Sequence, residues 1–157
     1  MKLQVVTVGK LREAYFKAAC DEYAGRIRHF LSFDECEVPS ATSDSGNGTG
    51  KGALQTEADS ILKQVQQGSK LVALDIKGKQ MSSEQLSQFL QDEMLASTNR
   101  LSFVIGGAWG LSPTLLESAA LRLSFSPMTF PHELARVMLY EQLYRALSLW
   151  KGLPYHK

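Results

Sequence analysis

The chain has 157 residues, which fits one domain with a hydrophobic core and leaves no room for two independent enzymes. Apolar residues make up 44% of it and charged residues 21%, and this ordinary balance excludes collagen-like, disordered and coiled-coil proteins. Seventeen basic and sixteen acidic residues leave a net charge of +1, so no global basic field gathers nucleic acid from a distance.

The first part of the chain alternates between the hydrophobic periods of a strand and of a helix. The expected elements are a strand over Lys2–Val8, a helix from about Arg12 to Phe30 and a strand over Phe33–Val38 that ends before Pro39. The glycine- and serine-rich segment Ser40–Gly52 is predicted to be a mobile surface loop. Its Gly50-Lys51 pair is similar to part of a P-loop, but Ser45 and Gly52 replace the glycine and the hydroxyl residue of that motif, which disfavours it.

The alternation continues up to a long C-terminal helix. The next expected elements are a helix marked by Leu54, Ala58, Ile61, Leu62 and Val65, a strand over Lys70–Ile76 and a helix capped by Ser82 or Ser83. They are followed by a strand over Leu101–Ile105 and by a short helix from Pro113 to about Leu121, with Ser112 as its N-cap. The last two expected elements are a strand over Arg122–Ser126 and a helix over Glu133–Trp150. The nearly continuous apolar run of Lys70–Ile76 indicates a central strand.

Strand and helix thus alternate along the whole chain. This order predicts one domain with an α/β fold, in which helices cover both faces of a mostly parallel sheet. Ligands of such folds bind beyond the carboxyl ends of the strands. The loops after Ile76, Ile105 and Ser126 are therefore the places where we expect a site.

The first two of these loops contain charged and glycine-rich segments. Asp75, Lys77 and Lys79 stand around the first strand end, where solvated turn charge explains them as well as a site does. The second loop is Gly106-Gly107-Ala108-Trp109-Gly110 before a helix start, an arrangement that lets backbone amides approach a nucleotide-like ligand. Ile105 occupies the first glycine position of the dinucleotide fingerprint, which disfavours a nicotinamide-linked oxidoreductase. A tight structural turn, with Trp109 covering the sheet edge, is the alternative.

The third loop, Phe125–His132, contains two prolines and three large apolar side chains. Such a rigid apolar segment suits one wall of an adenine or thioether site. Core packing explains the same side chains equally well.

The last helix has more apolar surface than one sheet face requires. One stripe consists of Leu139, Tyr140, Leu143, Ala146, Leu147 and Trp150, while Leu134, Val137, Met138 and Tyr144 lie off it. We expect a homodimer, which would bring the tail of one chain near a pocket of the other. Glu141 and Arg145 could be an ordinary surface ion pair. The tail Gly152–Lys157 combines aromatic and cationic groups suited to single-stranded RNA.

Features that the sequence lacks lead to expectations about the location of the protein in the cell and about metal binding. No stretch approaches the roughly 20 apolar residues that span a bilayer, and the start has no secretory apolar core, so we expect a cytoplasmic protein with no membrane contact. Cys20 and Cys36 form no CxxC pair and have no histidine at zinc spacing, so we expect two reduced thiols and no metal site.

Several strings in a fixed order resemble one known family. They are KLQVVTVGKL at the start, LDIKGK, FVIGG followed by a glycine three residues later, LSFSPMTFPH, YEQLYRA in the last helix and PYHK at the end. Together they are similar to the ribosomal large-subunit RNA methyltransferase H family, small enzymes of the SPOUT superfamily. The resemblance runs from Met1 to Lys157 and weakens only in Ser40–Gly52.

This resemblance implies a C-terminal trefoil knot, an exception to the rule that chains do not thread loops. It also implies methylation of N3 of a pseudouridine in a 23S rRNA hairpin, with the assembled 70S ribosome as substrate because a nearly neutral protein binds naked RNA weakly. By motif position, the S-adenosylmethionine site would consist of Leu74, Gly106, Phe125, Ser126, Pro127, Met128, Thr129 and Phe130. Pro127 removes one backbone donor from that site.

The resemblance also suggests residues for the chemistry. Tyr155 and His156 of the partner chain would position the base and transfer its proton, and Arg145 would steady the imide anion, while Arg136 and Lys157 would bind RNA. Water could accept the proton instead, and His132 could simply cap the last helix. A ribosome-associated binding factor with the same fold and no catalysis is the alternative function.

Overall fold

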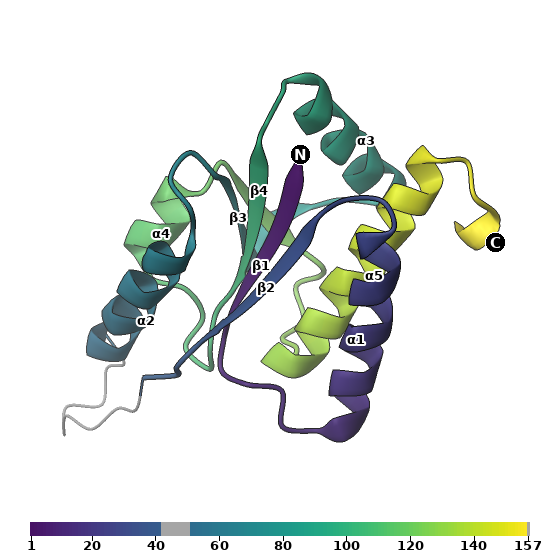
Figure 1. The fold of residues 1–157 in the computed structure, drawn as a ribbon. Helices are drawn as coiled ribbons and strands as arrows, with labels where there is room; N and C mark the ends of the chain where they lie inside the picture. The colour runs from purple at the N-terminus through teal and green to yellow at the C-terminus, as the bar shows by residue number, and fades with distance from the viewer. Residues whose placement is uncertain (42–50, 157) are drawn as a thin grey trace.

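The computed structural model describes residues 1–41 and 51–156 of the chain (Figure 1). Its elements are β1 (Lys2–Val8), α1 (Ala14–Arg28), β2 (Phe33–Val38), α2 (Lys51–Gln64), β3 (Lys70–Gln80), α3 (Ser83–Leu95), β4 (Arg100–Ile105), α4 (Pro113–Ser118), β5 (Leu121–Ser124), α5 (His132–Trp150) and the 3₁₀ turn η1 (Pro154–His156). Within the described residues, all five strands pair in parallel in the order β2-β1-β4-β3-β5. The expected α/β fold with a parallel sheet is confirmed.

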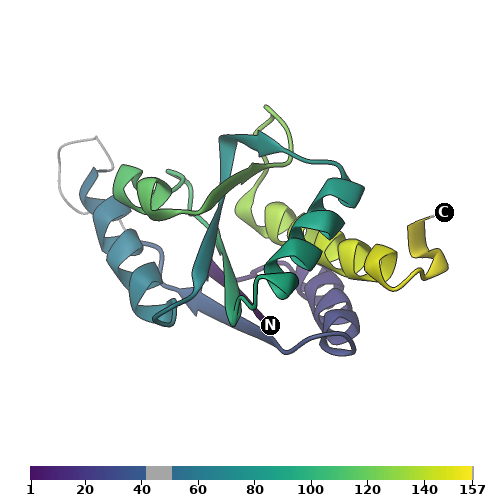
Figure 2. The ribbon, with the colours of Figure 1, turned by 90° about the horizontal axis from the view of Figure 1, so that it is seen from above.

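Two apolar layers hold the helices against the sheet. The strand β1 contributes Leu3 and Val5 to one layer and Val6 and Val8 to the other, as the twofold alternation of a strand requires. Helices α1, α3 and α5 cover the first face, and α2 and α4 cover the second (Figures 1 and 2). Both faces of the sheet are therefore covered, which explains why β1 and β4 are almost wholly buried.

Most of the expected elements agree with the structure, and the differences have local causes. The capping box of α3 forms at Ser82, whose side chain accepts a hydrogen bond from the backbone N–H of Gln85. The helix α4 ends at Ser118 rather than near Leu121, because the backbone N–H of Ala120 already donates to Leu71 of β3. The expected loop Ser40–Gly52 overlaps the start of α2, and its residues 42–50 lie outside the described part of the chain.

The strand β3 differs most from expectation. We expected it to end at Ile76 and to be followed by a charged turn, but it continues to Gln80 beside β5. Its pairing with β5 shifts between Leu74 and Lys79, which is a bulge. A Cβ atom at Gly78 would lie 2.6 Å from the backbone carbonyl of Arg122, so glycine is what lets the two strands approach. The strand is interior to the sheet, although β4 is the central one.

Much of the apolar surface of helix α5 that does not face the sheet packs against other helices of the same chain. It lies between α1 and α3, and Tyr144, which is off the main apolar stripe, packs against Tyr23 and Phe30 of the α1 region. The hydroxyl of Ser87 in α3 donates to the backbone carbonyl of Ala146 at 2.7 Å. Among the described residues, none of the helices has the length and apolarity needed to cross a membrane.

Candidate active site

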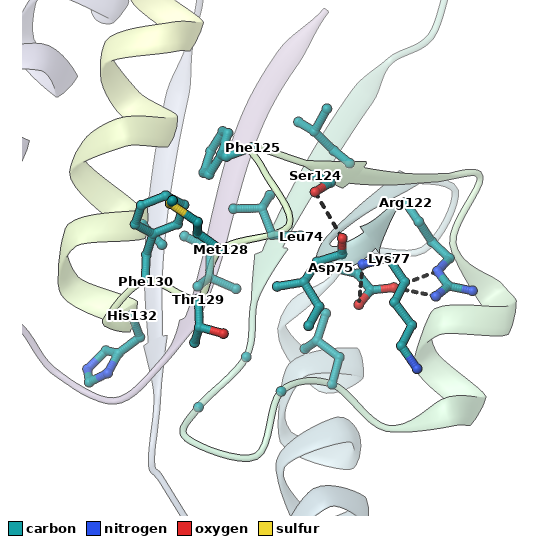
Figure 3. A pocket seen from close by; sticks show the side chains of 18 of the residues that line it. Leu74, Asp75, Lys77, Arg122, Ser124, Phe125, Met128, Thr129, Phe130 and His132 are labelled. Carbon is teal, nitrogen blue, oxygen red and sulfur yellow. Dashed lines mark hydrogen bonds and ion pairs between the residues drawn. The ribbon is translucent and has the colours of Figure 1, made fainter. Parts of the chain in front are cut away.

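A cavity of about 860 Å³ lies beyond the carboxyl ends of β4 and β5 and beside the middle of β3 (Figure 3). It is lined by the loops after β4 and β5, where the sequence predicts a site, and by residues 74–77, which lie within β3 and not in the loop expected after Ile76. Seven of the eight expected cofactor residues line it, namely Leu74, Gly106, Phe125, Ser126, Met128, Thr129 and Phe130. Pro127, the eighth, is not among the lining residues.

The glycine turn after β4 forms one wall through its main chain. The backbone N–H of Gly110 donates to the carbonyl of Gly107 at 3.0 Å, and Gly110 has a φ of +79°. A Cβ atom at Gly106 would lie 2.3 Å from the carbonyl oxygen of Gly110. At Gly107 it would meet Val8 at 3.0 Å and the buried carboxylate of Glu57 at 3.3 Å. The turn therefore closes only with glycines, and its backbone is left free to face a ligand.

The segment after β5 forms the opposite, apolar wall. The hydroxyl of Ser124 lies 3.1 Å from the carbonyl oxygens of Ile76 and Ser126, and the hydroxyl of Ser126 accepts a hydrogen bond from the backbone N–H of Met128 at 2.8 Å. These bonds fix the bend that brings Met128 and Phe130 to the cavity. Figure 3 shows Met128, Thr129 and Phe130 on one side of the cavity and Asp75, Lys77 and Arg122 on the other.

The charged side of the cavity contains a residue that sequence reasoning missed. Arg122 of β5 donates through Nε to Asp75 of β3 at 2.8 Å, and the pair lies across the two neighbouring strands. Asp75 also accepts a hydrogen bond from the backbone N–H of Lys77. Only the pairing of β3 with β5 could have revealed Arg122, because the two residues are far apart in the sequence.

The expected catalytic residues Arg145 and Tyr155 lie near the carboxyl end of α5 and in η1, whereas the cavity is lined by the amino-terminal end of α5. The guanidinium of Arg145 pairs with Glu141 and lies 4.8 Å from the centre of the Tyr155 ring. The hydroxyl of Tyr155 lies 3.4 Å from that of Tyr23 and from Glu141. Burial, with the Tyr23 hydrogen bond, raises the pKa of Tyr155 well above its ordinary value, so its phenol stays protonated at neutral pH.

The other expected site residues have different surroundings. His156 belongs to the same 3₁₀ turn as Tyr155, and Lys157 lies outside the described residues. Arg136 is only 6% exposed and pairs with Glu37 at 2.6 Å and Glu35 at 3.4 Å. The expected contact between Arg136 and RNA therefore gets no support from its position in the core.

His132 and Trp109 also belong to the cavity. Within the described residues, no side chain caps the start of α5, so the expected capping role of His132 is wrong, and His132 lines the cavity instead. Trp109 lines the cavity with 58% of its surface exposed and does not simply cover the sheet edge. The sequence singles out both residues, but it does not predict that their side chains line the cavity, because that depends on how the loops converge.

Comparison with known proteins agrees with this geometry. A family model described as "Predicted SPOUT methyltransferase" matches residues 1–156. Two proteins named "Ribosomal RNA large subunit methyltransferase H", from Alkaliphilus oremlandii and Clostridium botulinum, are 40% and 42% identical to the chain over 159 residues, with 100% of each chain covered. The crystal structure of a probable methyltransferase from Bordetella pertussis Tohama I has the same fold, with a TM-score of 0.57 at 11% identity, over 93% of this chain and 94% of that one.

Proposed function

The chain belongs to the SPOUT methyltransferase family, whose cofactor is S-adenosylmethionine, and on this premise we propose that it methylates large-subunit ribosomal RNA. The proposal depends on one observation above all, the convergence of the loops after β4 and β5 with residues 74–77 of β3 on a single cavity. The names of the full-length relatives support ribosomal RNA as the substrate.

The residues that line the cavity fit the cofactor. The main chain at Gly106 and Gly107 has no space for a side chain, so backbone groups can approach a ligand directly. Met128 and Phe130 offer apolar contacts for a flat base or a sulfur-bearing chain. The volume of about 860 Å³ lies in the upper part of the range of small-molecule sites, about 300–1,000 Å³.

We propose N3 of a pseudouridine in 23S rRNA as the methylated atom and the 70S ribosome as the substrate. The net charge of +1 supports an assembled particle, because shape must then supply the affinity that charge does not. An enzyme that acts on ribosomes works in the cytoplasm, the location that we propose.

When bound, S-adenosylmethionine supplies a methyl group on a positively charged sulfur. The protein has to orient the imide nitrogen in line with that methyl and help to remove its proton. Because burial raises the pKa of Tyr155, we assign it to positioning the base as a hydrogen-bond donor and not to accepting the proton. We assign proton transfer to His156, whose residue type titrates near neutral pH, and stabilisation of the imide anion to Arg145.

The distance along α5 supports a contribution of these groups from a second copy of the chain. Arg145 follows His132 by 13 residues of α5, which at 1.5 Å per residue separates them by about 20 Å, and Tyr155 is farther along. We therefore propose a homodimer in which the tail of one protomer completes the cavity of the other.

The trefoil knot also remains our proposal. The course of the chain supports it, since β5 pairs with β3 at one edge of the sheet and α5 then packs against α1. Between them, residues 125–131 pass beside the glycine turn at the cavity.

The function is tested by methyl transfer to ribosomes. Purified 70S particles are incubated with the protein and labelled S-adenosylmethionine, and the modified nucleotide is mapped by mass spectrometry of the rRNA. We expect one methylated pseudouridine in the 23S rRNA. Absence of S-adenosylmethionine binding in calorimetry, together with absence of methyl transfer, would favour the non-catalytic binding factor.

The contribution of the second protomer is tested by mixing two inactive variants. One variant has Gly106→Trp in the cavity, and the other lacks residues 155–157. If the tail acts on the partner's cavity, mixed dimers regain activity, because each contains one intact cavity beside one intact tail. A mixture that stays inactive after confirmed subunit exchange means that the tail acts within its own chain.

A further inference from the structure

We propose that Trp109 is the platform on which the target base of the RNA stacks. The inference rests on the proposed function and names the residue that holds the substrate at that site. It follows from the exposure of the ring, the rigidity of the turn that presents it and its place at the cavity.

The exposure of Trp109 is unusual for the largest apolar side chain. Its exposed fraction is 58%. The other tryptophan, Trp150, packs against the core and has Lys151 over its ring at 3.8 Å. Among residues 1–41 and 51–156, neither an aromatic ring nor a cationic group stacks on Trp109. A face of the indole is thus available to a flat partner.

The backbone holds this ring in a defined place. Trp109 lies between Gly107 and Gly110, which are joined by a bridge, and Gly106 packs directly on Gly110. Ser112 then caps α4 and fixes the end of the turn. A ring on a fixed turn loses little conformational freedom when a ligand binds, so stacking on it is favourable.

The surroundings of the ring suit a nucleotide of RNA. Met128 and Ile76 line the same cavity and are 71% and 53% exposed, so together with Trp109 they form an apolar rim. Lys77 lines it too, and no carboxylate of the described residues forms an ion pair with its side chain, which leaves its charge for a phosphate. Stacking on an aromatic ring with a nearby cation is how proteins hold unpaired bases.

The competing assignment is that Trp109 covers the adenine of the cofactor. The two assignments differ in which affinity depends on the ring. A platform for the target base affects the KM for the ribosome, whereas a cover for the cofactor affects the Kd for S-adenosylmethionine.

The test compares Trp109→Leu and Trp109→Phe with the unaltered protein in steady-state methyl transfer to 70S ribosomes and in calorimetry with S-adenosylmethionine. We expect Trp109→Leu to raise the KM for ribosomes about tenfold, the loss that removal of one stacking contact produces, with the cofactor Kd changed less than twofold. Trp109→Phe, which keeps an aromatic face, should recover most of the lost affinity. Leu95→Ala is the matched control, since Leu95 is 83% exposed and lies away from the cavity.

Each other outcome overturns the inference in a recognisable way. An unchanged KM for ribosomes in Trp109→Leu shows that the ring holds no base. A weaker cofactor Kd with an unchanged KM assigns the ring to the cofactor. If the unaltered protein transfers no methyl group to ribosomes, that result contradicts the proposed function itself and therefore also this inference.

Discussion

Gly106 determines whether the glycine turn can close beside the cavity. A Cβ atom there would overlap the carbonyl oxygen of Gly110 at 2.3 Å, so even alanine forces the turn to open. We expect Gly106→Ala to weaken S-adenosylmethionine binding at least tenfold in calorimetry. Gly25→Ala is the matched control, because nothing lies within 4 Å of its Cβ position in α1. Equal cofactor affinity in Gly106→Ala and the unaltered protein would remove the turn from the binding site.

Arg136 stabilises the fold through a buried ion-pair network. Its guanidinium joins Glu35 and Glu37 of β2 and donates through Nε to the hydroxyl of Tyr140 at 3.1 Å. Arg136→Ala leaves the half-buried Glu37 without its ion-pair partner, while Glu35 keeps Arg28 and the Tyr140 hydroxyl, and should lower the free energy of unfolding by about 2–3 kcal/mol in urea titration. Arg26→Ala, which breaks an exposed pair with Glu22, should lower it far less. Similar losses in both variants would contradict the structural role.

Single residues of the cavity were predictable where a motif or a strand end marked them. Gly106 and Phe130 were identified in this way, from the glycine turn and the proline-rich segment. Arg122 was not, because its place beside Asp75 follows from strand pairing, which no local pattern records. The burial of Arg136 was also missed, since a charged residue on a helix is usually exposed and only the acidic side chains of β2 explain its position.

At the scale of elements, helix α3 depends on its capping box. The side chain of Ser82 accepts from the backbone of Gln85, and the side chain of Gln85 accepts from the backbone of Ser82. Ser82→Ala should lower the free energy of unfolding by about 1 kcal/mol, measured in urea. Ser60→Ala is a useful contrast, because Ser60 bonds back to Thr56 within α2, where alanine is the better helix former. A Ser82→Ala protein as stable as the original would mean that the box does not hold α3.

The elements themselves were predictable from hydrophobic periodicity, and their ends were less so. The bounds of β1 and β2 agree with expectation because glycine or proline follows each strand. The extension of β3 to Gln80 was missed because Lys77, Gly78 and Lys79 have the composition of a turn. Pairing with β5 overrides that preference, which illustrates how strongly tertiary context decides the length of a strand.

At the scale of the whole molecule, the buried thiol of Cys20 links stability to alkaline pH. Burial raises the pKa of Cys20 from about 9 to about 11. Between these values the unfolded chain loses this proton while the folded chain keeps it, so stability falls as pH rises and the contribution is complete only below pH 9. At about 1.4 kcal/mol per unit, the loss by pH 11 is about 2 kcal/mol.

Urea unfolding at pH 8 and pH 10 measures this effect. Cys20→Ala removes the titrating group, so the fall in stability between the two pH values should be smaller in the variant than in the original. Burial likewise raises the pKa of Tyr140, which leaves some alkaline loss in both proteins. Identical falls in the two proteins would show that Cys20 does not contribute.

The pairing of β1 with β4 determines when during synthesis the protein becomes active. Lys2 of β1 lies beside Arg100 of β4 in the sheet. The edge of β1 that pairs with β4 therefore stays unpaired until most of the polypeptide has been made. The cavity needs still later segments, up to Ala135 at the start of α5. A nascent chain therefore lacks the complete cavity until the start of α5 has been made.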